Sequence, residues 1–191
     1  MRLFAALLAC ASFFLSPGAL AQQMAPDALV KSVTDEVLDI IRKDKDIKAG
    51  STRRAIELVE QKVLPHFNFT RMTALAVGKD WRQATPEQQK VLTEEFRDLL
   101  VRTYSNALSL YRDQVIEFKP LRMRPDDTEV TVKSDIRQKG AQPVTLDYDM
   151  EKTPSGWKVF DVKVSGVSLI TNYREDFAAQ VRESGIDGLI K

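Results

Sequence analysis

Cysteine and histidine are almost absent from this sequence of 191 residues, which contains one of each, Cys10 and His66. Cys10 lies in an N-terminal segment that we expect to be removed, so the mature chain has no thiol for a disulfide, a nucleophile or a metal ligand. A zinc site with one histidine would depend mostly on carboxylates, and no carboxylate cluster in the sequence suggests such a site. We therefore expect no metal and no cofactor, and a fold stabilised by its hydrophobic core.

Other signatures of catalysis are also missing. Neither Gly50 nor Gly78 has a second glycine nearby, which excludes a glycine-rich phosphate loop. Asp147 and Asp149 stand two residues apart, as an acid/base pair could, but their alternation with apolar neighbours predicts a solvated strand face. His66 follows a helix-breaking proline and is expected in a loop or on the surface. The sequence indicates no particular reaction, and we predict that the protein is not an enzyme.

An excess of charge of either sign is absent too. Once the N-terminal segment containing Arg2 is removed, 27 basic residues balance 27 acidic ones. This balance gives no electrostatic attraction toward nucleic acid or an anionic membrane surface.

A long apolar run occurs only at the start of the chain, from Leu3 to Leu15. It follows Arg2 and precedes Ala19-Leu20-Ala21, so it predicts a secretory signal peptide over residues 1–21, cleaved after Ala21. The run is too short for a membrane span. The alternative is a lipoprotein signal, because the residues before Cys10 loosely resemble a lipobox, although a better cleavage site follows. The mature chain, residues 22–191, has the length of one domain, and we expect it to be exported.

Apolar residues at helical spacing dominate the first half of the mature chain. The fourth predicted helix has the clearest start, because Thr85-Pro86-Glu87-Gln88 is a capping box with proline at the first helical position. That helix would be about 40 Å long and would support the sheet. The predicted helices cover 26–44, Ser51 to Pro65, Thr70 to Gly78, and 86–112.

After Asp113 the apolar period changes to two, which predicts an antiparallel meander of four strands. The predicted strands cover 115–119, 129–137, 143–152 and 157–165. A final helix begins near Thr171 or Asn172. Helices, then a meander, then a closing helix predict an α+β fold with the helices on one face of the sheet.

Alternation assigns the inward side chains of this sheet. No Asp, Glu or His falls at a central inward position, and Asp161 and Lys163 are assigned to the water-facing side. The inward residues are predicted to be Val130, Val132, Ile136, Val144, Leu146, Tyr148, Met150, Phe160, Val162 and Val164. Val164, Val167, Leu169, Tyr173 and Phe177 form an apolar corner between the last strand and the closing helix.

Several motifs in order resemble one family. Trp157-x-Val159-x-Asp161-Val162, Gly166-Val167-Ser168-Leu169 and Asn172-Tyr173-Arg174-x-x-Phe177 resemble the C-terminal signature of the MlaC family of periplasmic phospholipid-binding proteins, also called toluene-tolerance auxiliary proteins. Phe67-Asn68-Phe69, Gly78-Lys79-x-Trp81-Arg82, Thr85-Pro86-Glu87-Gln88 and Leu99-Leu100-x-Arg102-x-Tyr104 are similar to its central pattern. Asn68 stands where an acidic residue is expected, and Phe160 where a tyrosine is common.

The resemblance implies an NTF2-like fold with a deep pocket between a curved sheet and the helices. It implies a carrier that holds the acyl chains of a diacyl phospholipid and shuttles it between membrane complexes, maintaining outer-membrane lipid asymmetry. The implied partners are an inner-membrane ABC transporter with an MCE-domain subunit and an outer-membrane lipoprotein with a porin. We expect the carrier to be a monomer.

The predicted pocket combines the long helix, a central strand and the apolar corner. Its residues are Phe96, Leu99, Leu100, Tyr104, Leu146, Tyr148, Val164, Val167, Leu169 and Tyr173. Two alternatives remain open from the sequence. One is an NTF2-like isomerase or dehydratase acting on a small hydrophobic substrate. The other is an interaction module whose own aromatics fill the cavity.

Overall fold

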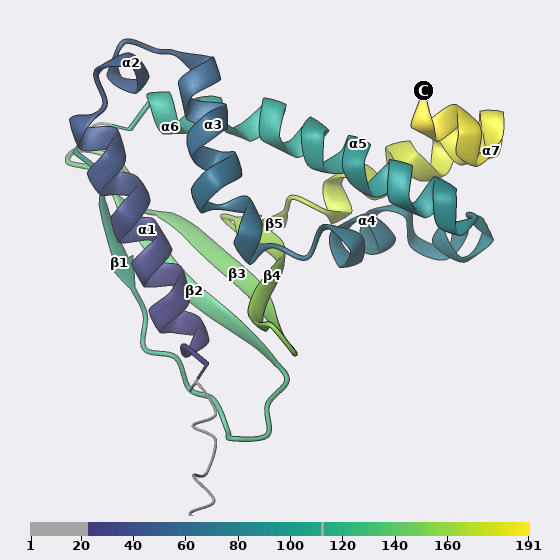
Figure 1. Cartoon of the computed structure of the whole chain (residues 1–191). Coiled ribbons are helices and arrows are strands. Elements are labelled where there is room, and N and C mark those ends of the chain that lie inside the picture. Colours follow the sequence, from purple (N-terminus) through teal and green to yellow (C-terminus); the bar gives the residue numbers. More distant parts are fainter. Residues whose placement is uncertain (1–22, 112) are drawn as a thin grey trace, which may run out of the picture.

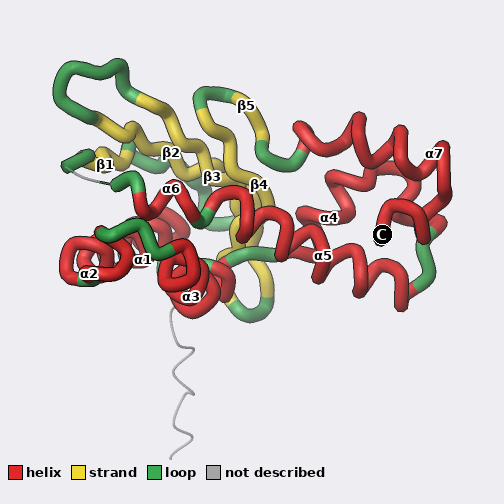
Figure 2. The backbone as a smooth tube through the Cα atoms, turned by 90° about the horizontal axis from the view of Figure 1, so that it is seen from above, coloured by secondary structure: helices red, strands yellow, loops and turns green. Residues whose placement is uncertain are grey.

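The computed structural model describes residues 23–111 and 113–191 (Figure 1). The predicted signal peptide, its cleavage after Ala21 and the question of lipid on Cys10 therefore lie outside the described residues. The chain has the predicted α+β architecture, with an antiparallel sheet and two groups of helices. One group lies over the sheet, and the other, containing α4, α5 and α7, extends to one side of it (Figure 2).

The sheet has five strands in the order of the sequence, each antiparallel to its neighbour. They are β1 (Val115–Phe118), β2 (Glu129–Arg137), β3 (Val144–Thr153), β4 (Gly156–Val164) and β5 (Val167–Ser168). The four predicted strands are confirmed, and β5 is an addition. It forms because Ser165 and Gly166 both have positive φ, 50° and 81°, as a two-residue type I′ hairpin requires.

The helices over the sheet are α1 (Pro26–Lys43), α2 (Lys45–Lys48), α3 (Thr52–Lys62) and α6 (Asn106–Ser109). Those in the lateral group are α4 (Phe69–Val77), α5 (Pro86–Tyr104) and α7 (Arg174–Ile190). Short 3₁₀ turns occupy Leu64–His66, Gly78–Gln83 and Thr171–Tyr173. None of the described helices is both long and apolar enough to cross a membrane.

Local capping signals place most helix starts. Ser51 caps α3 by accepting a hydrogen bond from the Arg54 backbone, and the capping box at Thr85 is present. The third predicted helix begins earlier than expected. Asn68, not Thr70, is its N-cap, because the Asn68 side chain accepts the Arg71 backbone N–H at 3.1 Å. Asparagine and threonine both favour this position, so the sequence alone did not distinguish them.

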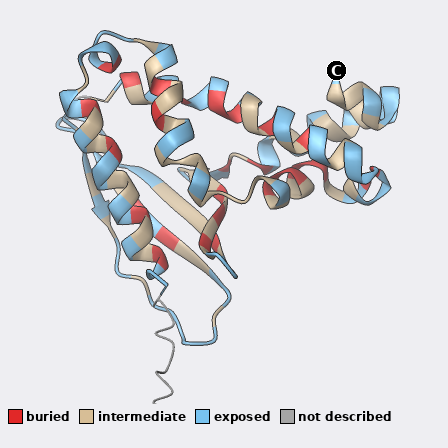
Figure 3. Cartoon of the chain, in the orientation of Figure 1, coloured by how far each residue is buried: buried red, intermediate tan, exposed pale blue. Residues whose placement is uncertain are grey.

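The prediction of one helix over 86–112 is wrong. Helix α5 ends at Tyr104, which makes it about 28 Å long at 1.5 Å per residue. The apolar side chains of α5 pack against α4 and α7, whereas Leu108 on α6 packs with Val37 and Ile41 of α1. The two halves of the stripe thus have different partners. The helix that lies over the sheet is α1, not α5 (Figure 3).

A β-bulge in β4 overturns the predicted alternation of that strand. Asp149 of β3 pairs with Asp161, but Met150 pairs with Val159, so Phe160 is an extra residue without a partner. Phe160 therefore lies on the outer face of the sheet, where the Arg71 guanidinium is 3.6 Å from its ring centre. Asp161, predicted to face water, is only 7% exposed.

Candidate functional site

A cavity of about 730 Å³ lies between α1, α6 and the inner face of the sheet. On the α1 side it is lined by Leu29, Val30, Val33, Thr34, Val37, Leu38 and Ile41. On the sheet side it is lined by Ile116, Ile136, Val144, Leu146, Tyr148, Met150, Val159 and Val164. Val63, His66, Phe67, Tyr104, Ala107, Leu108, Leu110, Tyr111, Gln114 and Leu169 complete the wall.

The size of this cavity is that of a binding space. Its volume falls within the usual range for ligand pockets, about 300–1,000 Å³. Its wall is mostly apolar, so an apolar ligand in the cavity would remove apolar surface from water.

Five of the ten residues predicted for the pocket lie on the cavity wall. They are Tyr104, Leu146, Tyr148, Val164 and Leu169.

The other five predicted residues lie away from the cavity. Phe96, Leu100 and Tyr173 belong to a second hydrophobic cluster between α4, α5 and α7, where Tyr173 and Phe177 both pack against Phe96 at 5.3 Å between ring centres. Leu99 on α5 is 39% exposed and Val167 on the β4–β5 hairpin is 58% exposed. The sequence shows which residues are apolar, but not that the lateral helices enclose a separate core.

The largest part of the wall missed by sequence reasoning comes from α1. Its apolar stripe, Val30, Val33, Val37 and Ile41, was visible in the sequence as an amphipathic helix. Nothing in that pattern assigns the stripe to a cavity rather than a filled core. Figure 3 shows the buried positions of α1 turned toward the sheet.

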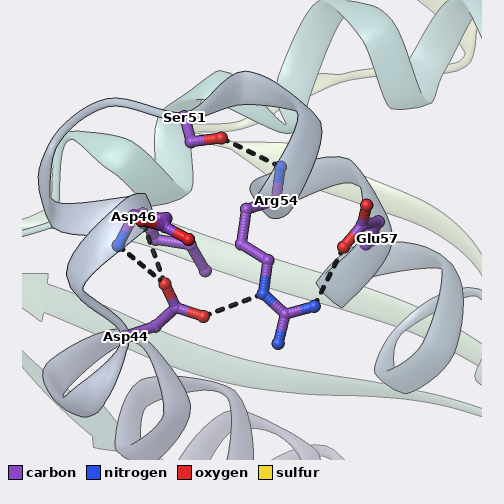
Figure 4. Close-up of polar contacts among 6 residues, drawn as sticks. Asp44, Asp46, Ser51, Arg54 and Glu57 are labelled. Atoms are coloured by element: carbon purple, nitrogen blue, oxygen red, sulfur yellow. Dashed lines mark hydrogen bonds and ion pairs between the residues drawn. The ribbon is translucent and has the colours of Figure 1, made fainter.

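The α1 wall is held in place by a polar corner at its C-terminal end (Figure 4). The Asp44 carboxylate caps α2 by accepting the backbone N–H groups of Asp46 and Ile47, each at 3.0 Å. Its other oxygen accepts Arg54 Nε at 2.9 Å, and Arg54 Nη1 also reaches Glu57 at 3.0 Å. The bond from Ile47 N–H, followed by that from Arg54, lowers the pKa of Asp44 below its usual value. The Asp44 carboxylate is therefore negatively charged at neutral pH.

His66 lies in the short turn Leu64–His66 between α3 and α4, where it is half-buried and lines the cavity. Burial lowers its pKa below the usual value, and the nearby positive charge of Lys158 lowers it further. The imidazole is therefore neutral at pH 7. No Asp, Glu, Lys or Arg among the described residues lines the cavity.

Two tyrosines of the wall, Tyr104 and Tyr148, also remain uncharged. Burial raises the pKa of Tyr104 to about 12, with a further contribution from its hydrogen bond to Tyr173. Burial raises the pKa of Tyr148 as well. The cavity thus presents aliphatic groups, aromatic rings and neutral polar atoms to a ligand at physiological pH.

The exposed residues of the wall gather at one end of the cavity, although Val37 and Ile41 on the α1 side of that end are buried. At one end, between α6 and the start of β3, Leu110 is 66% exposed, Val144 38% and Tyr104 36%. At the other end Val30, Met150 and Val159 are buried in a core cluster with Trp157. We call the exposed end the mouth and the buried end the floor.

Polar contacts join the elements around the mouth. Arg42 Nη2 donates a hydrogen bond to the Tyr111 hydroxyl at 2.9 Å, and that hydroxyl donates to the Gln114 carbonyl at 3.0 Å. The chain of contacts connects the end of α1 with the segment between α6 and β1.

The Ser168 hydroxyl supports the wall near Leu169. Ser168 Oγ accepts the backbone N–H groups of Ile170 and Thr171 at 3.1 and 3.0 Å. These bonds fix the corner that places Leu169 on the cavity wall and Ile170 in the second cluster. Burial raises the pKa of the neighbouring Asp161 above its usual value, while Ser168 opposes this shift.

Arg71 of α4 fastens the lateral helices to the outer face of the sheet. Its Nη1 lies 2.8 Å from Glu151 and its Nη2 2.7 Å from Glu129, while its guanidinium stacks on Phe160. Asn68 donates a hydrogen bond to Glu151 at 2.7 Å. Asparagine suits this position because an acidic side chain would repel Glu151.

The remaining acidic candidates show no arrangement for chemistry. Asp149 accepts hydrogen bonds from Thr131 at 2.7 Å and pairs with Lys163 at 2.6 Å, and Asp147 lies 3.8 Å from Lys133. All face away from the cavity. Across residues 23–111 and 113–191, no group of three or more His, Cys, Asp or Glu side chains is placed to hold a metal ion.

The fold and the cavity together define an α+β protein built around an apolar binding space. The family model described as "MlaC protein" matches residues 31–191, and the chain belongs to the MlaC family.

Characterised relatives match most of the chain. The intermembrane phospholipid transport system binding protein MlaC of Haemophilus influenzae is 24% identical over 182 residues, covering 94% of this chain and 85% of that protein. The toluene tolerance protein ttg2D of Pseudomonas putida is 24% identical over 163 residues, covering 85% and 75%.

A solved structure has the same fold. The phospholipid-binding protein from Ralstonia solanacearum, determined in complex with a phospholipid, is 42% identical. It superposes with a TM-score of 0.81, covering 87% of this chain and 93% of that one.

Proposed function

We propose that this protein is a periplasmic phospholipid carrier, which holds the acyl chains of a diacyl lipid in the cavity with the headgroup at the mouth. The apolar cavity of about 730 Å³ is the observation that carries the proposal. The relative from Ralstonia solanacearum, solved with a phospholipid, supports it. The neutral state of His66, Tyr104 and Tyr148 also suits hydrocarbon chains.

The energetics favour transfer by docking over release into water. Each methylene exposed to water costs about 0.8 kcal/mol, so a diacyl lipid with some thirty methylenes would lose on the order of 24 kcal/mol. A carrier needs only to bury the acyl chains as well as a bilayer does. Lipid exchange then requires the mouth of the cavity to contact an apolar surface of a membrane partner, so that the acyl chains are not exposed to water. The proposed partners are an inner-membrane ABC transporter complex with an MCE-domain subunit and an outer-membrane lipoprotein with a porin. Such exchange would maintain outer-membrane lipid asymmetry.

The proposal includes export. Residues 1–21 act as the signal peptide, cleavage follows Ala21, and residues 22–191 form one lipid-binding domain without lipid on Cys10. The apolar run from Leu3 to Leu15 supports export. Intact-mass measurement of the exported protein should give a chain that begins at Gln22.

We propose no catalytic step in the carrier. An isomerase or dehydratase needs an acid or base beside its substrate. Among the described residues that line the cavity, His66 is the only one from the group His, Asp, Glu, Lys and Arg. No described carboxylate lines the cavity to orient that imidazole.

Mass spectrometry of the mature protein, purified from a lysate that contains membranes, tests the function. Native spectra should show an added mass that denaturing spectra lose, and extraction should identify it as phospholipid. A bound small hydrophobic substrate or its product would instead indicate an enzyme. A protein that stays empty even after incubation with phospholipid vesicles would indicate an interaction module.

A further inference from the structure

The end of the cavity away from its exposed wall residues is closed by residues of a hydrophobic core cluster. Met150 is 0% exposed, Val159 3% and Val30 7%, and all three both line the cavity and pack in the cluster with Trp157. At the mouth, by contrast, Leu110 and Val144 are exposed. An elongated ligand that enters through the mouth must therefore stop at the floor.

Two independent measures give the depth of the cavity. Along α1 the wall extends from Leu29 to Ile41, which is about 18 Å at 1.5 Å per residue. Along β3 it extends from Val144 to Met150, which is about 20 Å at 3.4 Å per residue. One leaflet of a bilayer has a hydrocarbon depth of about 15 Å, half of the full core. The cavity is thus one acyl chain deep, with little length to spare.

We propose that Val30 and Met150 set the longest acyl chain that the carrier accepts. This inference rests on the proposed function and adds a specificity to it. Val30 comes from α1 and Met150 from β3, and they meet across the floor in one cluster. Because both are held by the surrounding core, the floor does not retreat for a longer chain.

Selectivity follows from where the surplus methylenes lie. A chain that ends above the floor is buried equally well in the carrier and in a bilayer, so its length makes no difference to exchange. A chain that is too long leaves methylenes at the mouth, and each exposed methylene lowers relative occupancy by roughly fourfold. Chain length therefore has no effect up to a limit and a steep effect beyond it.

Val30→Phe tests the proposal by raising the floor, since the larger ring extends into the cavity. The matched control is Val144→Phe, the same substitution at the exposed mouth. Delipidated protein is incubated with vesicles that contain equal amounts of myristoyl and stearoyl phosphatidylethanolamine, and native mass spectrometry measures the ratio of the two bound lipids. Val30→Phe should shift the ratio toward the myristoyl lipid by at least tenfold relative to the control.

A second variant acts in the opposite direction. Met150→Val lowers the floor and should move the ratio toward the stearoyl lipid, which keeps the test decisive if Val30→Phe does not fold. Wild type that binds lipid, with both variants unchanged in their ratio, would overturn the chain-length proposal alone. Wild type that binds neither lipid would overturn the proposed function itself.

Discussion

Replacing Val164 with tryptophan tests whether the cavity is a true binding space. Val164 lies on the wall opposite α1 and pairs with Leu146 in the neighbouring strand. An indole directed into the cavity would occupy the volume of about two to four methylenes of an acyl chain. At about 0.8 kcal/mol each, lipid binding should weaken by about 1.6–3.2 kcal/mol, or roughly 15- to 200-fold.

Val167→Trp is the matched control, because Val167 is in the same hairpin but is 58% exposed and does not line the cavity. Phospholipid per protein after vesicle incubation, together with the melting temperature of delipidated protein, would be compared for wild type and both variants. We expect lower lipid content for Val164→Trp alone, with a melting temperature near that of wild type.

A solid core would give a different pattern for the same substitution. Overpacking would cost about 1–3 kcal/mol, and each kcal/mol lowers the melting temperature of a domain this size by roughly 2–4 °C. A sharp drop in melting temperature without a selective loss of lipid would therefore refute the assignment of this space as a cavity.

Two further predictions concern titratable groups. His66→Ala should leave lipid transfer between vesicles nearly unchanged at pH 7, because the imidazole is neutral there; a loss of roughly a hundredfold, about 2.7 kcal/mol as a barrier, with the fold intact would show an active role. For Asp161, the raised pKa means that the folded state binds its proton more tightly than the unfolded chain. Its contribution to stability is therefore complete below the unfolded pKa and lost as pH rises through the folded pKa. In urea denaturation at a series of pH values, Asp161→Asn should gain stability relative to wild type as pH rises through this range, and a difference that stays constant with pH would contradict the assignment.

Elements with local signals were predictable from sequence. The four long strands, the capping box at Thr85 and the closing helix depend on alternation, caps and turns that a few neighbouring residues specify. The start of α4 differed by two residues because Asn68 and Thr70 are both good caps.

Features that depend on long-range packing were not predictable in this way. The stripe of α5 and the stripe of α1 look alike in the sequence, yet α5 packs in the lateral core and α1 forms the cavity wall. Phe96 and Tyr173 were therefore placed in the pocket, and Val33 and Val37 were not. The two helices differ in the elements against which they pack, and the apolar stripe of a helix does not specify those elements.

Because of the bulge at Phe160, strand β4 contributes side chains both to the cavity and to the contact with the lateral helices. Without the extra residue, a strand in which Val159 faces the cavity would turn Asp161 inward as well and Val162 outward. The bulge shifts the phase of the alternation once, so Val159 and Val162 share the inner side, while Phe160 supplies an aromatic surface for Arg71 on the outer side. An alignment of such sequences by hydrophobic alternation alone would thus fall out of step at this position. A deletion of Phe160 would restore a regular strand and keep the cavity-facing side chains, but it would remove the aromatic ring on which Arg71 of α4 stacks.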